Sequence, residues 1–431
     1  MRRLDSREAG FAEAFAAIVS DRRESDGDVG RDVAAILAEV RARGDAALVD
    51  YTAKFDRWTL ADEADWKIAP EDCAAAFAAL TPELRGALET AATRIRAYHA
   101  AQLPEDRDYT DAAGVRLGAK WRGVDAAGLY VPGGRAAYPS SLLMNAIPAK
   151  VAGVERLVVV TPTPDGKVNQ LVLAAAHLAG VDEIWRVGGA HAVAALAYGT
   201  ARIRPVDVIT GPGNAWVAEA KRQLYGVVGI DMVAGPSEIL VIADAQNDPR
   251  WIAIDLLSQA EHDPAAQSIL ITDDAAFADA VAAAVEAELR TLATEAAARA
   301  SWDTHGVIVT VASLDEAPAL ANALAAEHVE IATDTPDALF ARLRHAGSVF
   351  LGRHTPEAVG DYVAGPNHVL PTGRRARFAS GLSVLDFMKR TSFIALDADS
   401  LARIGPAAVA LADAEGLPAH GRSVSVRLGN G

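Results

Sequence analysis

Two polar residues continue the buried stripe of a predicted helix. The stretch DLLSQAEHDP (residues 255–264) ends an amphipathic pattern whose apolar positions include Ile252 and Leu256, and the next positions along that stripe are Gln259 and His262. A buried amide or imidazole needs a polar partner. The pair is therefore either a hydrogen-bonded cluster at a helix end or two ligands of a metal such as zinc, which draws its other ligands from distant segments.

A carboxylate and an imidazole stand side by side in AAEHVEI (residues 325–331). Histidine is the usual general base near neutral pH, and a neighbouring carboxylate can orient a water molecule or supply a second base. Adjacent residues point about 100° apart on a helix and to opposite faces of a strand, so Glu327 and His328 address one pocket only from a helix end or a loop. The pair alone is compatible with catalysis or with an ordinary polar pair.

Two glycine-rich loops follow predicted strands. VITGPGNAWVAEAK (residues 208–221) enters a helix directly after GPGN, and RVGGAHA (residues 186–192) makes the same turn one repeat earlier. Backbone N–H groups at a helix N-terminus bind phosphate, and open α/β sheets bind ligands at their carboxyl edge. Neither loop is GxGxxG and the sequence has no Walker A motif. The loops therefore predict either a nucleotide-binding edge or ordinary tight turns.

Further polar residues stand in Gly/Pro-rich surroundings toward the C-terminus. Asp361 and His368 lie in VGDYVAGPNHVLPT, and His420 lies in AEGLPAHGRS. A single Asp or His in a loop usually is solvated or stabilises a turn. Each therefore has a structural interpretation beside a functional one.

Alternating strands and helices must position these residues. Two series of β-branched runs separated by helical runs predict parallel βαβ units, hence two Rossmann-like but incomplete α/β domains. Near the C-terminus, SVSVRL (residues 423–428) is expected to form a strand that must pair with the edge of a sheet. The predicted units are a helical arm (1–24), a discontinuous α/β domain (25–128 with 236–381), a second α/β domain (129–235) and a small C-terminal segment (382–431).

Composition narrows the class of protein. The chain has 431 residues and a formal net charge of −16, which opposes binding to nucleic acid, and no stretch reaches the ~18 apolar residues of a membrane helix. The N-terminus lacks the apolar core of a signal peptide, so we expect a cytoplasmic protein. The single cysteine, Cys73, excludes an intrachain disulfide, and its Ala-rich surroundings predict a small buried side chain.

Long blocks of the sequence resemble histidinol dehydrogenase, the zinc- and NAD-dependent family that ends histidine biosynthesis. The resemblance runs in order from near residue 25 to the C-terminus and rests on GLYVPGGRAAYPSSLLMNAIPAKVAGV, VITGPGNAWVAEAKRQLYGVVGIDMVAGPSEILVIAD, DLLSQAEHDP, GPNHVLPTG and SGLSVLDFMKR. It implies a four-electron oxidation of L-histidinol through L-histidinal to L-histidine with two NAD in sequence and one zinc per subunit.

Carried over residue by residue, the resemblance also implies roles. His328 is the implied general base and Glu327 the group that activates water. The implied zinc ligands are Gln259, His262, Asp361 and His420, all four of which also bind the substrate. The remaining implied substrate contacts are Ser237, His328, His368 and Glu415, and the NAD contacts are Tyr130, His191 and Asn214.

The resemblance further implies a homodimer with shared active sites. The C-terminal segment of one subunit would carry Glu415 and His420 into the site of its partner. Three stretches depart from the family pattern. His191 replaces a usual glutamine, Ala326 replaces a usual proline, and Arg374 with Arg375 replaces smaller residues, which we expect to be surface charges.

Three alternatives remain beside the family activity. The nearest is a related zinc- and NAD-dependent dehydrogenase of another small polar alcohol, such as a sulfonated diol, which should differ at Glu415 and His368. A zinc hydrolase that uses Glu327 and no cofactor would leave the two glycine-rich loops without a role. A non-catalytic nucleotide-binding scaffold would not need every ligand and base.

Overall fold

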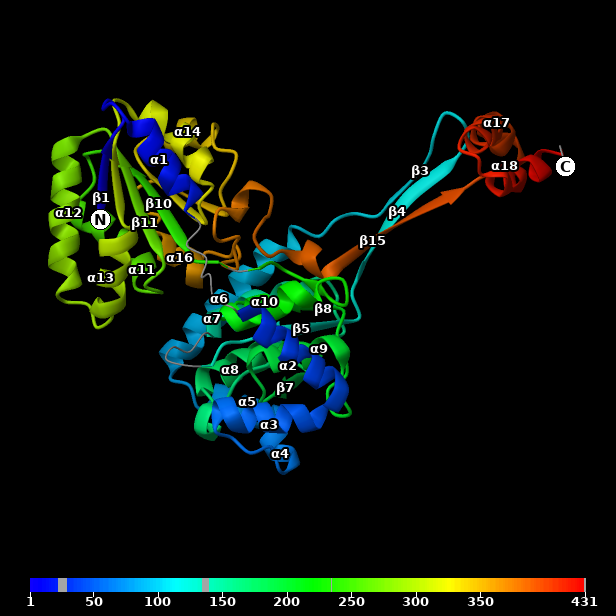
Figure 1. The fold of residues 1–431 in the computed structure, drawn as a ribbon, viewed down its shortest axis with the longest axis horizontal. Helices are drawn as coiled ribbons and strands as arrows, with labels where there is room; N and C mark the ends of the chain where they lie inside the picture. Colours follow the sequence, from blue (N-terminus) through cyan, green and yellow to red (C-terminus); the bar gives the residue numbers. More distant parts are fainter. Residues whose placement is uncertain (22–28, 134–138, 234, 430–431) are drawn as a thin grey trace.

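The computed structural model describes residues 1–21, 29–133, 139–233 and 235–429. It contains two α/β lobes, each built on a six-stranded sheet, and a long arm that projects away from both (Figure 1). We call the lobe that contains the N-terminal strand lobe A and the other lobe B, and name their sheets likewise. Within the described ranges, no helix is both long and apolar enough to cross a membrane.

Sheet A is parallel throughout and joins the N-terminus to the second half of the chain. Its strands lie in the order β1-β12-β11-β10-β13-β14. β10 and β11 are completely buried, because helices cover both faces of the sheet. The strands are β1 (Arg2–Asp5), β10 (Glu238–Ala243), β11 (Gln267–Thr272), β12 (Val307–Thr310), β13 (His328–Ala332) and β14 (Ser348–Leu351).

Two helical layers enclose sheet A. One layer comprises α11 (Pro249–Ala260), α12 (Ala275–Leu289) and α13 (Glu295–His305), and the other comprises α1 (Phe11–Ser20), α14 (Ala317–Leu324) and α15 (Pro336–Phe340). The expectation of a helical arm over 1–24 was wrong for residues 1–21. β1 pairs with β12, and Phe15 and Ile18 pack into the lobe A core; residues 22–24 lie outside the described ranges.

Sheet B repeats the same parallel design. Its strands lie in the order β2-β7-β6-β5-β8-β9, and only β2 is antiparallel to its neighbour. The strands are β2 (Lys67–Ile68), β5 (Ala126–Tyr130), β6 (Arg156–Val160), β7 (Glu183–Trp185), β8 (Val208–Thr210) and β9 (Gly229–Ile230).

The N-terminal helices cover sheet B, which corrects the predicted domain 25–128 with 236–381. One face carries α5 (Pro70–Ala78), α6 (Pro82–Ala100), α7 (Pro139–Val151) and α8 (Gln170–Ala179); the other carries α2 (Val29–Arg43), α3 (Asp45–Asp56), α9 (Gly189–Tyr198) and α10 (Ala215–Leu224). The physical reason is α9, which is buried from Ala190 to Ala197 and needs apolar cover on more than one side. Cys73 of α5 is buried in this core, as predicted, and burial raises the pKa of its thiol to about 11.

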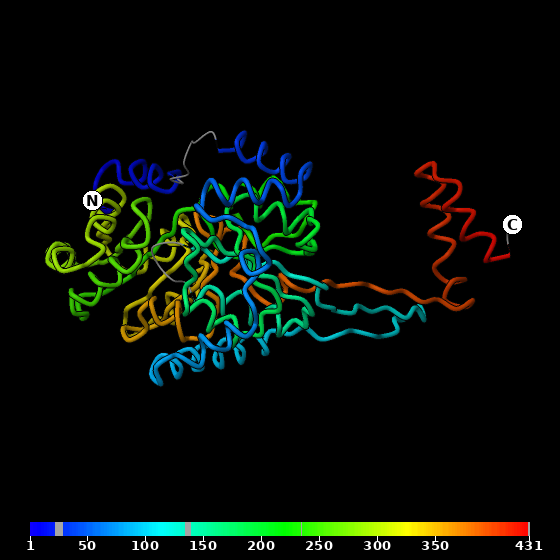
Figure 2. The backbone as a smooth tube through the Cα atoms, turned by 90° about the horizontal axis from the view of Figure 1, so that it is seen from below, coloured from blue at the N-terminus to red at the C-terminus, as the bar shows by residue number. Residues whose placement is uncertain are grey.

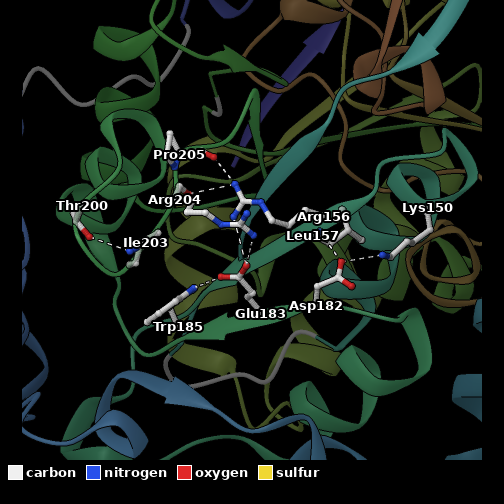
Figure 3. Close-up of polar contacts among 10 residues, drawn as sticks. All are labelled: Lys150, Arg156, Leu157, Asp182, Glu183, Trp185, Thr200, Ile203, Arg204 and Pro205. Carbon is white, nitrogen blue, oxygen red and sulfur yellow. Dashed lines mark hydrogen bonds and ion pairs between the residues drawn. The ribbon is translucent and has the colours of Figure 1, made fainter.

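Ion pairs close the amino edge of sheet B (Figure 3). Arg156, the first residue of β6, lies 3.5 Å from Glu183 Oε1 at the start of β7, and Trp185 Nε1 donates to Glu183 Oε2 at 3.0 Å. Asp182 accepts from Lys150 Nζ at 2.9 Å and from Leu157 N at 2.8 Å. These contacts fix the strand ends that point away from the site described below.

The arm is an antiparallel three-stranded sheet with two helices at its tip. β4 (Arg116–Gly123) lies between β3 (Arg107–Thr110) and β15 (Met388–Ala395), and the chain then forms α17 (Ala398–Ala414) and α18 (Pro418–Ser425), far from both lobes (Figures 1 and 2). The predicted SVSVRL strand is wrong, since this stretch ends α18 and forms a 3₁₀ turn. Val424 and Leu428 are four apart and both pack at Gly405 of α17, which a strand would not allow.

The remaining elements are short. They are α4 (Glu63–Trp66), α16 (Glu357–Tyr362) and the 3₁₀ helices Pro164–Gly166, Leu314–Glu316, Arg375–Arg377, Val384–Phe387 and Val426–Leu428.

Candidate active site

A cavity of about 430 Å³ lies where the carboxyl edge of sheet B meets the amino edge of sheet A. Lobe B contributes the loops that follow β5 and β8, including Pro132 and Asn214, and lobe A contributes residues that precede or begin β10 and β13. The sequence-predicted residues that line this cavity are Asn214, Ser237, His262, Glu327, His328, Asp361 and His368.

The loop after β8 is built around one glycine. Gly211 has a φ of 113°, and a Cβ there would lie 2.2 Å from the carbonyl oxygen of Tyr130. Asp231 Oδ2 accepts from Gly211 N at 2.8 Å, and Lys221 Nζ donates to the Gly211 carbonyl at 3.1 Å. Lys221 and Asp231 are themselves a buried ion pair. This pair fixes the loop against β5 and gives the cavity a rigid wall.

Glu327 lies in the bend just before β13 and is almost completely buried. Its Oε2 accepts a hydrogen bond from Glu238 N at 3.2 Å. Burial and the nearby charge of Glu238 raise the pKa of Glu327 well above its ordinary value, whereas hydrogen bonds from Glu238 N and Ser237 oppose the shift. The carboxylate is therefore a stronger base than a solvated glutamate.

His328 begins β13, opposite Ile239 of β10, and is also buried. Its Nδ1 lies 3.0 Å from Gln259 Oε1, and its Nε2 lies 3.5 Å from Glu357 Oε1. Burial lowers the pKa of His328, so the imidazole is neutral near pH 7 and able to accept a proton. Both side chains line the same cavity, Glu327 from the bend before β13 and His328 from the first residue of that strand, whereas the sequence led us to expect both on a helix end or a loop.

Gln259 and His262 meet although the helix stops between them. α11 ends at Ala260, so Gln259 is buried in its last turn while His262 lies in the following turn and is exposed on one side. Gln259 Nε2 nevertheless lies 3.3 Å from His262 Nδ1. The inward stripe of α11 therefore turns polar where it reaches the cavity.

Glu357 is a residue of this region that the sequence analysis missed. It begins α16, is 1% exposed, and its Oε2 accepts from Ser258 Oγ at 3.2 Å. Burial, together with the charge of Glu357, raises the pKa of Asp361 to about 8. The available signal was the spacing, because Glu357 and Asp361 are four apart and share a helix face.

His368 connects the two lobes beside this cluster. Its Nδ1 donates to the carbonyl oxygen of Asp361 at 2.9 Å, and its Nε2 lies 3.2 Å from Ser141 Oγ of α7. Burial lowers the pKa of His368 to about 4, so it is neutral. A neutral imidazole held at both nitrogens is suited to position a substrate.

The residues around His328 fit a divalent cation. His328, Glu357 and Asp361 place ligand atoms within 4.8 Å of one another, and Gln259 and His262 adjoin them. Among the described residues, His328 Nε2 and Glu357 Oε1 are buried without a hydrogen-bond partner. Imidazole nitrogen with carboxylate and amide oxygen is a donor set that zinc accepts, and a cation would offset the charges of buried Glu357 and partly buried Asp361.

A second cavity, of about 410 Å³, adjoins the first on the lobe B side. It is lined by all three predicted NAD contacts, Tyr130, His191 and Asn214. Pro132 and Asn214 line both cavities. A ligand in the second cavity can therefore approach a molecule in the first.

Aromatic contacts hold His191 in the wall of the second cavity. Its ring stacks on Tyr51 and Phe55 with centroid distances of 5.5 and 6.1 Å, and burial lowers the pKa of His191 to about 3. Its Nδ1 is buried with no hydrogen-bond partner in the described structure. Beside it, the Tyr130 hydroxyl accepts from Gly189 N at 3.0 Å, at the first turn of α9.

Comparison with known proteins gives one consistent result. The profile of the family "Histidinol dehydrogenase" matches residues 19–428. The chain belongs to the histidinol dehydrogenase family. It is 63% identical to histidinol dehydrogenase of Zymomonas mobilis over 426 residues, 99% of each chain, and 63% identical to that of Rhodospirillum rubrum over 430 residues, 100% of this chain and 99% of the relative. The crystal structure of histidinol dehydrogenase from Elizabethkingia anophelis superposes with a TM-score of 0.94 at 34% identity, covering 99% of this chain and 98% of the other.

Membership in the histidinol dehydrogenase family identifies the chain as an oxidoreductase of histidine biosynthesis. It also agrees with the observed parallel-sheet α/β fold. Three of the predicted substrate and zinc contacts, however, are not among the described residues that line the first cavity, and one of them is Gln259, which is buried beside His262 and His328. Glu415 follows α17 and His420 lies in α18, both exposed at the tip of the arm, and neither is among the described residues that line the cavity (Figure 1). That Glu415 and His420 complete the active site of a partner subunit remains a prediction.

The expectation of a surface charge at Arg374 was wrong. Arg374 is 3% exposed, donates to Gln267 Oε1 at 2.5 Å and to the Ile18 carbonyl at 3.2 Å, and forms an ion pair with Glu238 at 3.3 Å. Glu238, at the amino edge of sheet A, is buried next to Glu327. A buried carboxylate needs a cation, which Arg374 supplies. Arg375 is half-buried and donates to the Thr372 carbonyl at 3.3 Å.

Proposed function

We propose that this chain oxidises L-histidinol through L-histidinal to L-histidine, using two NAD in sequence, in the cavity between the lobes. The observation that carries the proposal is the pair of adjoining cavities. One holds the acid–base residues Glu327 and His328, the other holds the predicted NAD contacts, and Pro132 with Asn214 borders both. Dehydrogenation needs substrate and cofactor in contact and away from bulk water.

Zinc is the metal we propose for the cluster beside His328. Gln259, His262 and Asp361 would hold it from one subunit, and His420 would complete the set from the partner. When bound, zinc would anchor the amino and imidazole nitrogens of the substrate and NAD would accept hydride. The carboxylates of buried Glu357 and partly buried Asp361 lie close to each other and to His328, which supports a cation at this place.

The protein's own residues would handle protons and water. His328 is neutral and would accept the hydroxyl proton of histidinol in the first oxidation. Glu327, a buried and strengthened base, would remove a proton from the water that adds to the aldehyde, and His328 would assist the second oxidation. Ser237 and His368 would orient the substrate, since both line the cavity.

Counting the products tests the reaction. Metal-loaded and chelator-stripped protein would be incubated with L-histidinol and NAD, and NADH per histidine would be measured at completion. We expect two NADH per histidine, loss of activity on stripping, and recovery with zinc. Fully loaded protein that makes no NADH from histidinol would overturn the proposal and direct the search to other small polar alcohols.

A shared active site makes a separate prediction about mixed dimers. His328→Asn and His420→Asn subunits should each be nearly inactive alone, because one lacks the base and the other the partner's ligand. Unfolded together and refolded at equal amounts, they should recover about one quarter of wild-type activity, since half the dimers form with one intact site each. No recovery in a mixture shown by mass to contain mixed dimers would contradict sharing.

A further inference from the structure

The second cavity contains a single negative charge. Its described lining residues include aromatic, glycine and proline residues beside Tyr130, His191 and Asn214, and among them Asp56 is the only one with a charged side chain, because burial keeps the pKa of His191 at about 3. No described lining residue is Arg or Lys. A pocket for a phosphorylated ribose would normally supply such a cation.

Asp56 is held in place by its backbone surroundings. It is the last residue of α3, is 7% exposed, and its Oδ2 accepts a hydrogen bond from Thr163 N at 3.2 Å. The adjacent Arg57 has a φ of 53° and binds Asp165 through two hydrogen bonds of 2.8 Å, although its charge also acts on Asp56 and lowers the pKa of that carboxyl against the effect of burial. Within the described part of the chain Asp56 forms no ion pair, so its carboxylate keeps hydrogen-bonding capacity for a ligand.

Asp56 lines the same cavity as the predicted NAD contacts Tyr130 and His191. Its charge is close enough to Tyr130 to contribute to the raised pKa of that phenol. Tyr130 in turn accepts from Gly189 N, where the N-terminus of α9 offers backbone N–H groups. His191, buried and with an unpartnered Nδ1, lines the same cavity. A dinucleotide that places its phosphates at this helix end would have its riboses in the same cavity, which Asp56 also lines.

We propose that Asp56 is the residue that selects NAD over NADP by accepting hydrogen bonds from a ribose diol and repelling a 2′-phosphate. This inference rests on the proposed NAD-dependent function. The two ribose hydroxyls are neutral donors that match a carboxylate, whereas a phosphate at the same position would bring a second negative charge next to Asp56. Specificity then comes from one repulsive element as well as from one attractive contact.

Direct binding and turnover together test the role of Asp56. Dissociation constants of NAD and NADP would be measured by titration calorimetry, and kcat/KM for both cofactors with L-histidinol, in the wild type, Asp56→Asn and Asp56→Ser. We expect each variant to lower the preference for NAD over NADP by about tenfold or more. The change should combine weaker NAD binding with stronger NADP binding, which a merely structural loss would not produce. The matched control is Asp50→Asn on the exposed side of the same helix, which should leave the preference unchanged.

The outcomes separate this inference from the proposed function. Unchanged NAD preference in folded Asp56→Asn and Asp56→Ser proteins that still bind NAD would overturn the role of Asp56 and leave the function intact. A wild type that binds NAD in preference to NADP but does not oxidise histidinol would overturn the proposed function. The binding constants of the variants would still test the role of Asp56. A wild type that binds neither dinucleotide would overturn both.

Discussion

The two sheets have the same strand order but present opposite edges to the site. Apart from the edge strands β1 and β2, each sheet has five parallel strands, which lie in the chain order third, second, first, fourth, fifth, as β12-β11-β10-β13-β14 and as β7-β6-β5-β8-β9. Sheet B presents the carboxyl ends of β5 and β8, which is the usual ligand edge of an open α/β sheet. Sheet A presents the amino ends of β10 and β13, where Ser237, Glu327 and His328 stand.

Each sheet closes its other edge with arginine and carboxylates. At the amino edge of sheet B, Arg156 pairs with Glu183 (Figure 3), and at the carboxyl edge of sheet A, Arg353 pairs with Asp244 at 2.7 Å and with Asp334 at 2.9 Å. The open edges differ in chemistry as well. Sheet B offers neutral loops and backbone N–H groups, whereas sheet A offers buried acids and bases. We infer that the same topology serves a cofactor at one edge and proton transfer at the other.

The largest effect should follow from removing the base at the edge of sheet A. His328→Asn should lower kcat by about 10² to 10⁴-fold, the usual contribution of general base catalysis, with a smaller change in NAD binding. Steady-state NADH formation and NAD titration measure the two quantities. His177→Asn, at an exposed histidine of α8, is the control. A kcat within threefold of wild type would place the base elsewhere.

Zinc affinity should depend on pH through Asp361, which lies beside the amino edge of sheet A. In the metal-free protein the pKa of Asp361 is about 8, and a cation binds the deprotonated carboxylate. Protons therefore compete below that pKa, and the zinc dissociation constant should fall about tenfold for each unit of pH rise up to about pH 8 and level off above it. Titration calorimetry in the wild type and in Asp361→Asn checks this. The slope should diminish in the variant, and a slope retained in full would assign the proton to another group.

A moderate effect should follow from shortening His191 at the edge of sheet B. His191→Ala removes the ring that stacks on Tyr51 and Phe55 and the buried Nδ1, so KM for NAD should rise by about five- to tenfold with kcat little changed. His191→Gln restores an amide and should keep KM within about threefold. A fall in kcat at unchanged KM for NAD would contradict the division of cofactor binding to the sheet B edge and proton transfer to the sheet A edge.

The smallest effect on catalysis should come from the closed edges. Arg156→Met and Arg353→Met should each lower the free energy of unfolding by about 1–2 kcal/mol, since partly buried pairs are lost, while kcat/KM stays near wild type. Chemical denaturation and steady-state kinetics measure these quantities. If the folded variants lost activity although their stability kept them folded, the closed edges would influence the active site and this prediction would be wrong.

Local pattern was sufficient for much of the fold and for the type of site residue. The strands β6 to β8 and β10 to β14 fall on the predicted β-branched runs, whereas β1, β2 and β9 were not predicted. The polar end of the α11 stripe marked Gln259 and His262, whose side chains lie 3.3 Å apart, with His262 lining the cavity. The adjacent residues Glu327 and His328 could be recognised as candidate site residues from their types and from their place next to a predicted strand. Glu357 and the buried Arg374 were missed or misjudged, because their roles depend on carboxylates that come from other segments.

The sequence by itself determined the elements, their apolar faces and the residues fit for acid–base and metal chemistry, since these depend on neighbours within a few positions. Only the tertiary structure decided which sheet the N-terminal helices cover, which edge of each sheet faces the site, and that SVSVRL packs as a helix on Gly405. Those outcomes depend on contacts between segments more than a hundred residues apart or on a choice between two periodicities that one short stretch satisfies equally. Burial and charge in the assembled fold, not local pattern, make that choice.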